Sequence, residues 1–208
     1  MDDKAITSST LNATYPWSKT LVEALLPHTT PHSYRKGIRL DLRQGDKPVC
    51  RLIISGTADV YRSTDQLLVV RVPAFTIIGL GINDIYIVTA EPCKIATLPL
   101  DEVHHYIQNQ GLWEVLAKHM VMISSKLFSY SKQLSAPTAY EVICNQLVQL
   151  IHEPEAIRRN IPIERFIRDR THLSRSSIMK ILADLKTGGY ISIENGRLIA
   201  IHHLPQRY

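Results

Sequence analysis

A chain of 208 residues, of which 45% are hydrophobic and 21% charged, can bury the core of one large or two small domains, and this composition excludes the disordered and collagen-like classes. No run of about 18 uncharged apolar residues is present, so we expect no membrane-spanning helix. The net charge is +5, and the start of the chain, Met1-Asp2-Asp3-Lys4, differs from a basic signal peptide, which predicts a cytoplasmic protein.

The positive charge is concentrated in the last quarter of the chain. Residues 158–208 contain ten basic and four acidic residues and carry +6, whereas residues 1–157 contain 14 basic and 15 acidic residues and carry −1. Such an asymmetry indicates a polyanionic partner for the C-terminal part, in the first place nucleic acid. The alternative is a solvated basic surface without a partner.

The first half of the chain has the pattern of an all-β domain. Residues 1–30 are expected to form a loose polar arm and a short helix, Ser18–Leu26, that stops before Pro27. From residue 31 to 99, short runs rich in Val, Ile, Leu and Tyr alternate with turn residues, which favours a sandwich or barrel. The predicted strands are Ile38–Leu42, Arg51–Ser55, Ala58–Arg62, Leu67–Val72, Ile85–Ala90 and Lys94–Leu98.

A long helix is predicted within residues 100–135. Apolar residues spaced alternately by three and four positions form a coiled-coil seam, which consists of Trp113, Leu116, Met120, Ile123, Leu127, Tyr130 and Leu134. They predict a helix from Gly111 to Leu134 whose seam meets the same helix of a second copy. Leu112, Val115 and Met122 form a second stripe that can pack on the β domain. A helix buried within the monomer is the alternative.

Residues 136–208 have the element order of a winged helix-turn-helix. Residues 135–138, Ser-Ala-Pro-Thr, break the long helix and start another one, and this is the expected hinge. A helix over Pro162–Asp169, a turn at residues 171–173 and a helix that begins after Ser174 follow. Asn195-Gly196 lies between two alternating runs, which is a strong signal for a β-hairpin.

The helix after Ser174 has the pattern of a helix that reads DNA. Ser174 can cap it, and apolar residues at i, i+3, i+4 and i+7 predict a buried face. That face consists of Ile178, Ile181, Leu182 and Leu185. Ser176, Lys180 and Ala183 point the opposite way, and Arg175 stands at the N-terminal end. A helix that meets DNA end-on needs such donors in its first turn, with small residues behind them.

The order of barrel, long helix and winged helix-turn-helix resembles the Crp–Fnr superfamily of bacterial transcription factors. Residues 52–60, Leu-Ile-Ile-Ser-Gly-Thr-Ala-Asp-Val, are similar to the family hairpin I-x-x-G-x-x-x-V. Residues 173–182, Leu-Ser-Arg-Ser-Ser-Ile-Met-Lys-Ile-Leu, are similar to its recognition helix C-S-R-E-T-V-x-R-x-L. The resemblance covers about residues 31–204. Residues 171–205 further resemble the enterobacterial type that is described as inhibiting hydrogen peroxide resistance.

This resemblance implies an α+β fold with three parts. They are a cyclic-nucleotide-binding-like (cupin-type) β-barrel at residues 31–99, a dimerisation helix at residues 100–135 and a winged helix-turn-helix DNA-binding domain at residues 136–208. It also implies a homodimer that regulates transcription, with double-stranded DNA and RNA polymerase as partners and a link to oxidative stress.

The resemblance assigns base reading to three residues of the recognition helix. Arg175 matches the family's arginine, which suits bidentate contact with guanine. Ser176 stands where the family has a glutamate, so the target sequence is expected to differ, and Lys180 matches the second basic residue. The phosphate contacts expected to position the domain are Thr171, Ser174, Ser177 and Arg197.

The ligand of the barrel stays open. The cyclic-nucleotide receptors of this family need a glutamate for the ribose and an Arg-Ser pair for the phosphate. In the corresponding residues 77–86, Leu80 stands near the glutamate position, and no basic residue occurs between Arg71 and Lys94. A buried phosphate without a positive partner is costly, so we predict that cyclic AMP does not bind in the usual way.

No cofactor or metal is predicted. The three dispersed cysteines, Cys50, Cys93 and Cys144, are too few for the four ligands of the family's iron–sulfur cluster. Haem stays open as an alternative, with His28, His32, His104, His105 or a cysteine as its ligand. Cys93 and Cys144 are candidate redox thiols, the alternative being small buried hydrophobic residues.

Two other classes of function are alternatives to a DNA-binding regulator. A protein-interaction or small-molecule-binding module with a degenerate winged helix would bind DNA weakly, with a steep salt dependence and no sequence preference. An enzyme is not expected, because residues 31–99 contain a single histidine, His32, and no His-x-His…Glu metal set.

Overall fold

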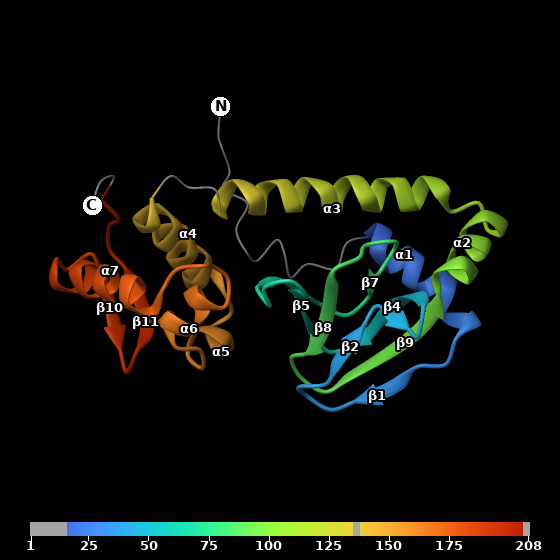
Figure 1. Ribbon diagram of the computed structural model, residues 1–208, viewed down its shortest axis with the longest axis horizontal. Helices are drawn as coiled ribbons and strands as arrows, with labels where there is room; N and C mark the ends of the chain where they lie inside the picture. The colour runs from blue at the N-terminus through green and yellow to red at the C-terminus, as the bar shows by residue number, and fades with distance from the viewer. Residues whose placement is uncertain (1–15, 135–137, 206–208) are drawn as a thin grey trace. The chain divides into compact units, whose positions relative to one another are not determined.

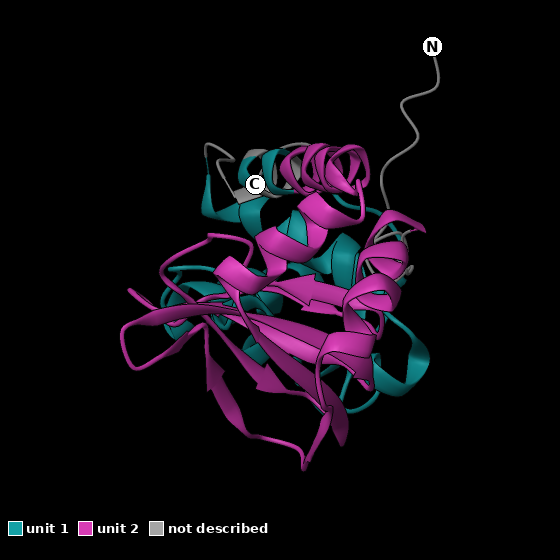
Figure 2. Cartoon of the chain, turned by 90° about the vertical axis from the view of Figure 1, so that its right-hand side faces the viewer, with its two compact units in different colours: residues 1–11, 127–208 teal, residues 12–126 magenta. Residues whose placement is uncertain are grey.

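The computed structural model describes residues 16–134 and 138–205, and gives only the backbone of residues 129, 130 and 132–134. The described chain divides into two compact units, the β unit within residues 12–126 and the winged unit within residues 127–208 (Figure 2). The predicted arm, residues 135–137 of the predicted hinge and the side chains of Tyr130 and Leu134 lie outside the described residues.

The strands of the β unit form two antiparallel sheets (Figure 1). The first has the order β1-β9-β4-β3, with β7 also paired to β4, and the second has the order β2-β8-β5-β6. The strands are β1 (His32–Tyr34), β2 (Arg39–Asp41), β3 (Arg43–Gln44), β4 (Lys47–Ser55), β5 (Ala58–Arg62), β6 (Leu68–Val72), β7 (Thr76–Ile78), β8 (Ile85–Thr89) and β9 (Cys93–Pro99). The all-β character predicted for this part is confirmed.

The first sheet is buried on both faces. Ile53 and Ile95 belong to a core that they share with Val60 and Ile87 of the second sheet. On the other face, Leu52 and its neighbours pack with α1 (Pro16–Leu25) and α2 (Leu100–Asn109). Because adjacent residues of a strand point to opposite faces, a strand that is buried on both sides reads as the continuous apolar run Leu52-Ile53-Ile54.

The conformation of Gly56 explains why the hairpin between β4 and β5 has a glycine at this position. It has a φ of +83°, and a Cβ at this position would lie 2.5 Å from the Pro92 carbonyl oxygen and 2.7 Å from the Cys93 sulfur. A side chain would therefore be strained by the backbone conformation and also collide with the strand beside it.

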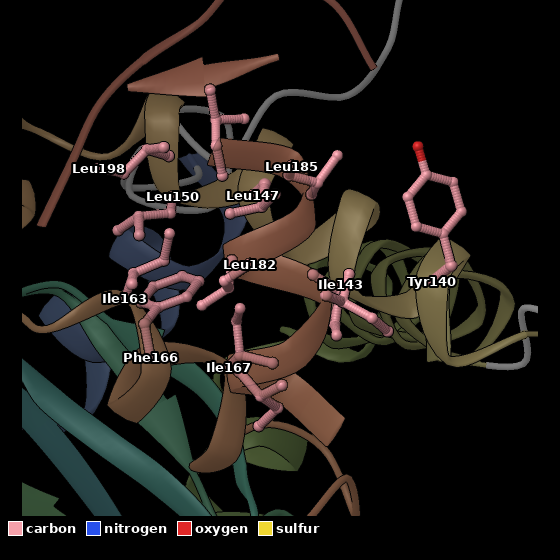
Figure 3. Close-up of a cluster of buried hydrophobic side chains, with 13 residues drawn as sticks. Tyr140, Ile143, Leu147, Leu150, Ile163, Phe166, Ile167, Leu182, Leu185 and Leu198 are labelled. Carbon is pink, nitrogen blue, oxygen red and sulfur yellow. The ribbon is translucent and has the colours of Figure 1, made fainter. Parts of the chain in front are cut away.

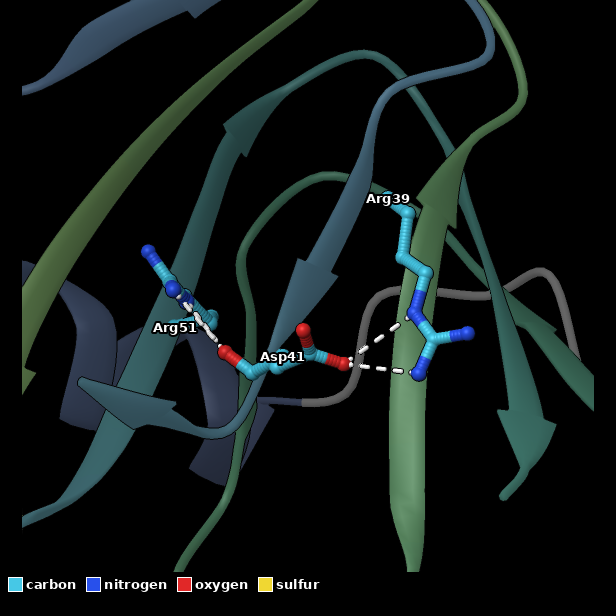
Figure 4. Close-up of polar contacts among 3 residues, drawn as sticks. All are labelled: Arg39, Asp41 and Arg51. Carbon is cyan, nitrogen blue, oxygen red and sulfur yellow. Dashed lines mark hydrogen bonds and ion pairs between the residues drawn. The ribbon is translucent and has the colours of Figure 1, made fainter. Parts of the chain in front are cut away.

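A buried arginine links the two sheets (Figure 4). Arg51 on β4 is 5% exposed, and its Nη2 donates a hydrogen bond of 2.8 Å to the carbonyl oxygen of Asp41 on β2. Arg39, also on β2, donates to the Asp41 carboxylate at 3.0 and 3.1 Å. The Arg51 guanidinium also donates to the Thr97 hydroxyl, so this buried cation has partners in both sheets.

Residues 100–135 contain two helices. After α2 ends at Asn109, Gly111 adopts a φ of +65°, and α3 runs from Trp113 to Leu134. The predicted helix of residues 111–134 is therefore confirmed apart from its first two residues, and α2 is a separate element. A left-handed residue between two helices stops the first one and redirects the chain.

Within residues 138–205, the winged unit contains the helices α4 to α7 and the hairpin of β10 and β11. Their bounds are α4 (Ala139–His152), α5 (Glu155–Arg158), α6 (Ile163–Arg168), α7 (Arg175–Thr187), β10 (Ile191–Glu194) and β11 (Arg197–Ile201). Thr138 and Glu141 form a capping box at the start of α4. Leu147, Phe166 and Leu182 lie in the core that joins α4, α6 and α7 (Figure 3). In the described residues no helix is both long and apolar enough to cross a membrane.

Candidate nucleic-acid interface

The helix-turn-helix is formed by α6 and α7, and their shared core fixes the face that α7 shows to solvent. All four residues of the predicted apolar face, Ile178, Ile181, Leu182 and Leu185, are buried, as predicted. They pack with Phe166 and Ile167 of α6. The opposite face of α7 is therefore free to meet a partner.

The N-terminus of α7 is suited to an anion. The Ser174 hydroxyl accepts a hydrogen bond of 3.1 Å from the Ser177 backbone N–H, which confirms the predicted cap. The hydroxyls of Ser176 and Ser177 lie 3.0 and 2.8 Å from that of Ser174. The first turn, which is described in full, contains no acidic residue. The positive end of the helix dipole is therefore not neutralised locally, and three hydroxyls surround it.

Arg175 is exposed and loosely held. Its side chain is 73% exposed, and its Nε lies 4.0 Å from Oε1 of Glu164 on α6. The same oxygen lies 3.0 Å from Nη1 of Arg168. Because 4.0 Å is too long for a hydrogen bond, Arg175 can leave Glu164 for a base edge at little cost.

The exposed face of α7 contains one residue that sequence reasoning missed. Ser176, Lys180 and Ala183 are exposed, as predicted from the helical period. Met179 is 48% exposed, and at 100° per residue it lies between Arg175 and Ser176 on this face. An exposed apolar side chain at this position can contact a thymine methyl group. The helical period of α7 predicts this exposed position for Met179. The residue was missed because methionine does not donate hydrogen bonds to bases.

The candidate phosphate contacts are not all accessible. Thr171 is 6% exposed, and its hydroxyl donates a hydrogen bond of 2.9 Å to the Ile167 carbonyl oxygen. This corrects the prediction for Thr171, which stabilises the turn between the helices instead of facing a partner. Ser177 is half-buried, whereas Ser174 and Arg175 are exposed at the start of α7.

The wing is the hairpin of β10 and β11, as the Asn-Gly signal predicts. Asn195 and Gly196 both have positive φ, +49° and +73°, as a type I′ turn requires. The Gly196 carbonyl oxygen accepts a hydrogen bond of 2.9 Å from the Ile163 N–H at the start of α6. This bond fixes the wing tip, and with it the half-buried Arg197, beside the helix-turn-helix.

The predicted dimer seam is only partly exposed. Trp113 and Leu127 are 46% and 45% exposed, whereas Leu116, Met120 and Ile123 are half-buried, and Leu116 packs on the core of the β unit. Two residues outside the predicted seam are more exposed, because Val121 is 68% and Phe128 75% exposed. They are seven residues apart and lie on one side of α3.

Two basic groups of α3 lie on a buried side of the helix and were also missed. His119 is 2% exposed, and its Nδ1 has no hydrogen-bond partner. Burial lowers the pKa of His119, and it lowers the pKa of the Lys126 ammonium to about 8. Arg71, which precedes the segment that corresponds to the cyclic-nucleotide pocket, is held by Asp59 through two hydrogen bonds of 2.6 and 2.8 Å.

The histidines named as candidate haem ligands each contact neighbouring side chains. His28 stacks on Tyr106 with a ring-centroid distance of 3.9 Å, and His105 contacts Asn109. His104 lies beside Trp113, while His32 lines a pocket with Tyr34 and Thr97. Within residues 16–134 and 138–205, no three His, Cys, Asp or Glu side chains are placed to hold a metal ion.

The cysteines lie in environments that favour the neutral thiol. Burial raises the pKa of Cys50 to about 12 and also raises the pKa of Cys93 and Cys144. Cys93 is 3% exposed, and its sulfur contacts the carbonyl oxygens of Thr57 and Glu91 at 3.2 Å. Cys144 is half-buried. Of the two candidate redox thiols, Cys144 is therefore the more accessible.

Comparison with known proteins supports both the domain and the fold. Residues 139–206 match the family model for winged helix-turn-helix DNA binding. The chain is 32% identical over 132 residues to the inhibitor of hydrogen peroxide resistance of Escherichia coli K12. That match covers 62% of this chain and 64% of the relative, which is less than two thirds of its length.

Solved structures share the architecture at low sequence identity. The c-di-GMP responsive global regulator CLP of Xanthomonas campestris superposes with a TM-score of 0.69 and 16% identity, over 88% of this chain and 98% of that chain. A protein of Eubacterium rectale described as a transcriptional regulator of the Crp–Fnr family gives a TM-score of 0.60 and 15% identity, over 93% and 92%. These likenesses confirm the predicted fold class.

Proposed function

Because the chain has the fold of the Crp–Fnr regulators and contains a winged helix-turn-helix, we propose that it is a transcription regulator that binds specific DNA sequences as a homodimer. The observation that carries this proposal is the exposed face of α7. This face combines an uncompensated helix N-terminus with the exposed residues Arg175, Ser176 and Lys180. It lies beside a wing that a backbone hydrogen bond holds in place.

In the proposed complex, the first turn of α7 enters the major groove. Arg175 leaves Glu164 and donates two hydrogen bonds to guanine, while Ser176 and Lys180 contact neighbouring base edges. Ser174, Ser177 and the backbone N–H groups at the start of α7 bind phosphate oxygens, which orients the helix without reading sequence. Ser176 replaces a glutamate of the family pattern, so the preferred sequence differs from the usual family site.

The exposed side of α3 supports the homodimer. Trp113, Val121, Leu127 and Phe128 are large apolar side chains that remain at least 45% exposed in one copy of the chain. A second copy of the same helix would cover them and would place two recognition helices on DNA. We expect the half-sites to be about 34 Å apart, one turn of the double helix.

The signal that controls DNA binding is proposed to be related to oxidative stress and not to be cyclic AMP. The name of the Escherichia coli relative, inhibitor of hydrogen peroxide resistance, supports the first part. The absence of a basic residue between Arg71 and Lys94 supports the second. Cys144, the more accessible candidate thiol, is the first residue to test for oxidation. The proposed role is regulatory and not enzymatic, in the bacterial cytoplasm, with RNA polymerase as a further partner.

The test is selection of bound fragments from fragmented bacterial genomic DNA at physiological salt. Wild-type protein should enrich a two-fold symmetric motif, and Arg175→Ala should lose that motif while keeping its fold. Lys186→Ala, in the last turn of α7, removes an exposed charge at the other end of the helix and serves as the control.

A failed enrichment distinguishes the alternative function. Weak binding by wild type and Arg175→Ala alike, with a steep salt dependence and no sequence preference, would contradict the proposal. It would favour a protein-interaction or small-molecule-binding module whose winged helix no longer reads DNA.

A further inference from the structure

A basic cavity lies at the edge of the wing, outside the recognition helix. It has a volume of about 350 Å³ and lies wholly within the winged unit. Its lining consists of Arg158, Arg159, Glu194, Asn195, Arg197, Leu198 and Ile199. The arginines come from two separate elements, since Arg158 ends α5, Arg159 follows it and Arg197 begins β11.

The arginines of this wing pocket retain hydrogen-bonding capacity. The Nε of Arg197 is buried without a hydrogen-bond partner, and its Nη1 reaches the Asn195 carbonyl oxygen at 3.4 Å. Arg158 donates one long hydrogen bond of 3.5 Å to the Ile151 carbonyl oxygen. Arg159 pairs with Glu155 at the surface, where an ion pair contributes little to stability. A buried donor without a partner is costly, and an acceptor that enters the pocket would relieve this cost at Arg197.

The charge and shape of the pocket favour a phosphate group. The described lining residues include three arginines and one acidic residue, Glu194. Guanidinium groups present parallel N–H donors that match the oxygens of a phosphate. Two apolar residues, Leu198 and Ile199, complete the lining.

The position of the pocket indicates where such a phosphate comes from. Arg197 directly follows the wing tip, and the Gly196 carbonyl oxygen is bonded to the first residue of α6. The pocket is therefore fixed to the helix-turn-helix by the same hairpin that forms the wing. A DNA strand that passes the wing tip would bring its next phosphates to Arg158 and Arg159.

We infer that the wing pocket of Arg158, Arg159 and Arg197 binds a phosphate of the DNA backbone beside the half-site that α7 reads. The inference rests on the proposed function. It adds Arg158 and Arg159 to the interface, and it assigns them affinity without sequence preference, because phosphates are the same at every base pair.

The experiment compares wild-type protein with Arg158→Gln/Arg159→Gln in the full chain. The dissociation constant is measured over a range of salt concentrations for the genomically selected duplex and for a scrambled duplex of equal length. The control is Arg35→Gln/Lys36→Gln, an adjacent pair of exposed basic residues in the β unit. Losing one phosphate contact should reduce the salt slope by about 0.9 and weaken binding about fivefold at 0.15 M salt.

The expected result is the same loss on both duplexes, with the preference for the selected duplex unchanged. The control variant should keep the wild-type slope. Unchanged binding of both duplexes by the double variant would overturn the inference. So would a loss confined to the selected duplex, because that result would assign the arginines to base reading. If wild type itself shows no preference, the proposed function fails, but the salt slope still tests the pocket.

A second measurement locates the phosphate on the DNA. Neutral methylphosphonate groups replace single phosphates beside the half-site, one position at a time. Wild type should lose affinity at one flanking position, and the double variant should lose none there. Arg158→Lys/Arg159→Lys, which keeps the charge, should retain most of the salt slope. If the double glutamine variant does not fold, Arg159→Gln alone, whose side chain is 73% exposed, takes its place. Equal losses at all positions for both proteins would contradict the assignment.

Discussion

Two arginines of the β unit, Arg51 and Arg71, and two of the winged unit, Arg175 and Arg197, are held in different ways. In the β unit, Arg51 is 5% exposed and bonded to the Asp41 carbonyl oxygen, and Arg71 makes two short hydrogen bonds to Asp59. In the winged unit, Arg175 is 73% exposed and 4.0 Å from its nearest carboxylate oxygen. The Nε of Arg197 has no partner at all. Of these four arginines, the two with strong hydrogen bonds stabilise the sheets, and the two that are weakly bonded lie on the candidate DNA-binding surface.

The largest effect is expected from an arginine of the β unit. Arg51→Ala removes the cation that joins the two sheets and leaves the Asp41 carbonyl oxygen without its donor. The free energy of unfolding should fall by about 2–3 kcal/mol. Urea unfolding followed by circular dichroism measures this change. If Arg51→Ala lowered the free energy of unfolding no more than Arg175→Ala does, the two arginines would not differ in their contribution to stability.

The second effect is expected on DNA binding. Arg175→Ala should weaken binding of the selected duplex by about 1–3 kcal/mol, because one bidentate base contact is lost. Its urea midpoint should stay within error of wild type, since a 4.0 Å ion pair at the surface contributes little. Fluorescence anisotropy on labelled duplexes gives the affinity. A large fall in stability would instead make Arg175 a structural residue, like Arg51.

The comparison extends to exposed apolar residues. Phe128→Ser should raise the dimer dissociation constant about tenfold or more, because a large side chain at a helix interface is a typical hot spot. Val148→Ser, which changes a 40% exposed residue on α4, is the matched control. Sedimentation velocity over a concentration series measures both variants. Equal dimer dissociation constants for Phe128→Ser and Val148→Ser would show that the exposed side of α3 is not the dimer interface.

The smallest effect concerns a buried thiol and its pH dependence. Burial raises the pKa of Cys50 from 9.0 to about 12, so the folded state keeps a proton that the unfolded chain releases above about pH 9. This contribution to stability is complete below pH 9 and is lost as the pH rises towards 12. Urea unfolding at pH 8, 9.5 and 10.5 should show a steeper decline for wild type than for Cys50→Ala. Parallel declines would contradict this origin.

The last prediction compares the accessibility of the three thiols. In native protein at pH 8, N-ethylmaleimide should label the half-buried Cys144 faster than Cys50 or Cys93, which are buried. Mass spectrometry of the digested protein measures the three rates. Faster labelling of Cys93 than of Cys144 would make Cys93 the first candidate for a redox thiol.

Elements with a strong local pattern were predictable from sequence. β5 spans Ala58–Arg62 as predicted, since it lies between two clear turns. The cap at Ser174, the buried face of α7 and the Asn-Gly hairpin also follow from contacts within a few residues. Short elements were missed, among them β1, β3 and β7 of two or three residues, and α5. β1 and β7 pair with strands that lie far away in sequence, whereas β3 pairs with the adjacent β4, and elements of two to four residues are too short to show a period.

The sequence by itself determined the α+β architecture, the charge of the C-terminal quarter and the residues that α7 shows to solvent, because period, capping and turn chemistry act over short distances. Only the tertiary structure decided which polar side chains are available. It buried Thr171, tied Arg51 and Arg71 to partners in the sheets, and brought Arg158 and Arg159 to the wing beside Arg197. Burial and pairing depend on residues that are distant along the chain, and those contacts exist only once it has folded.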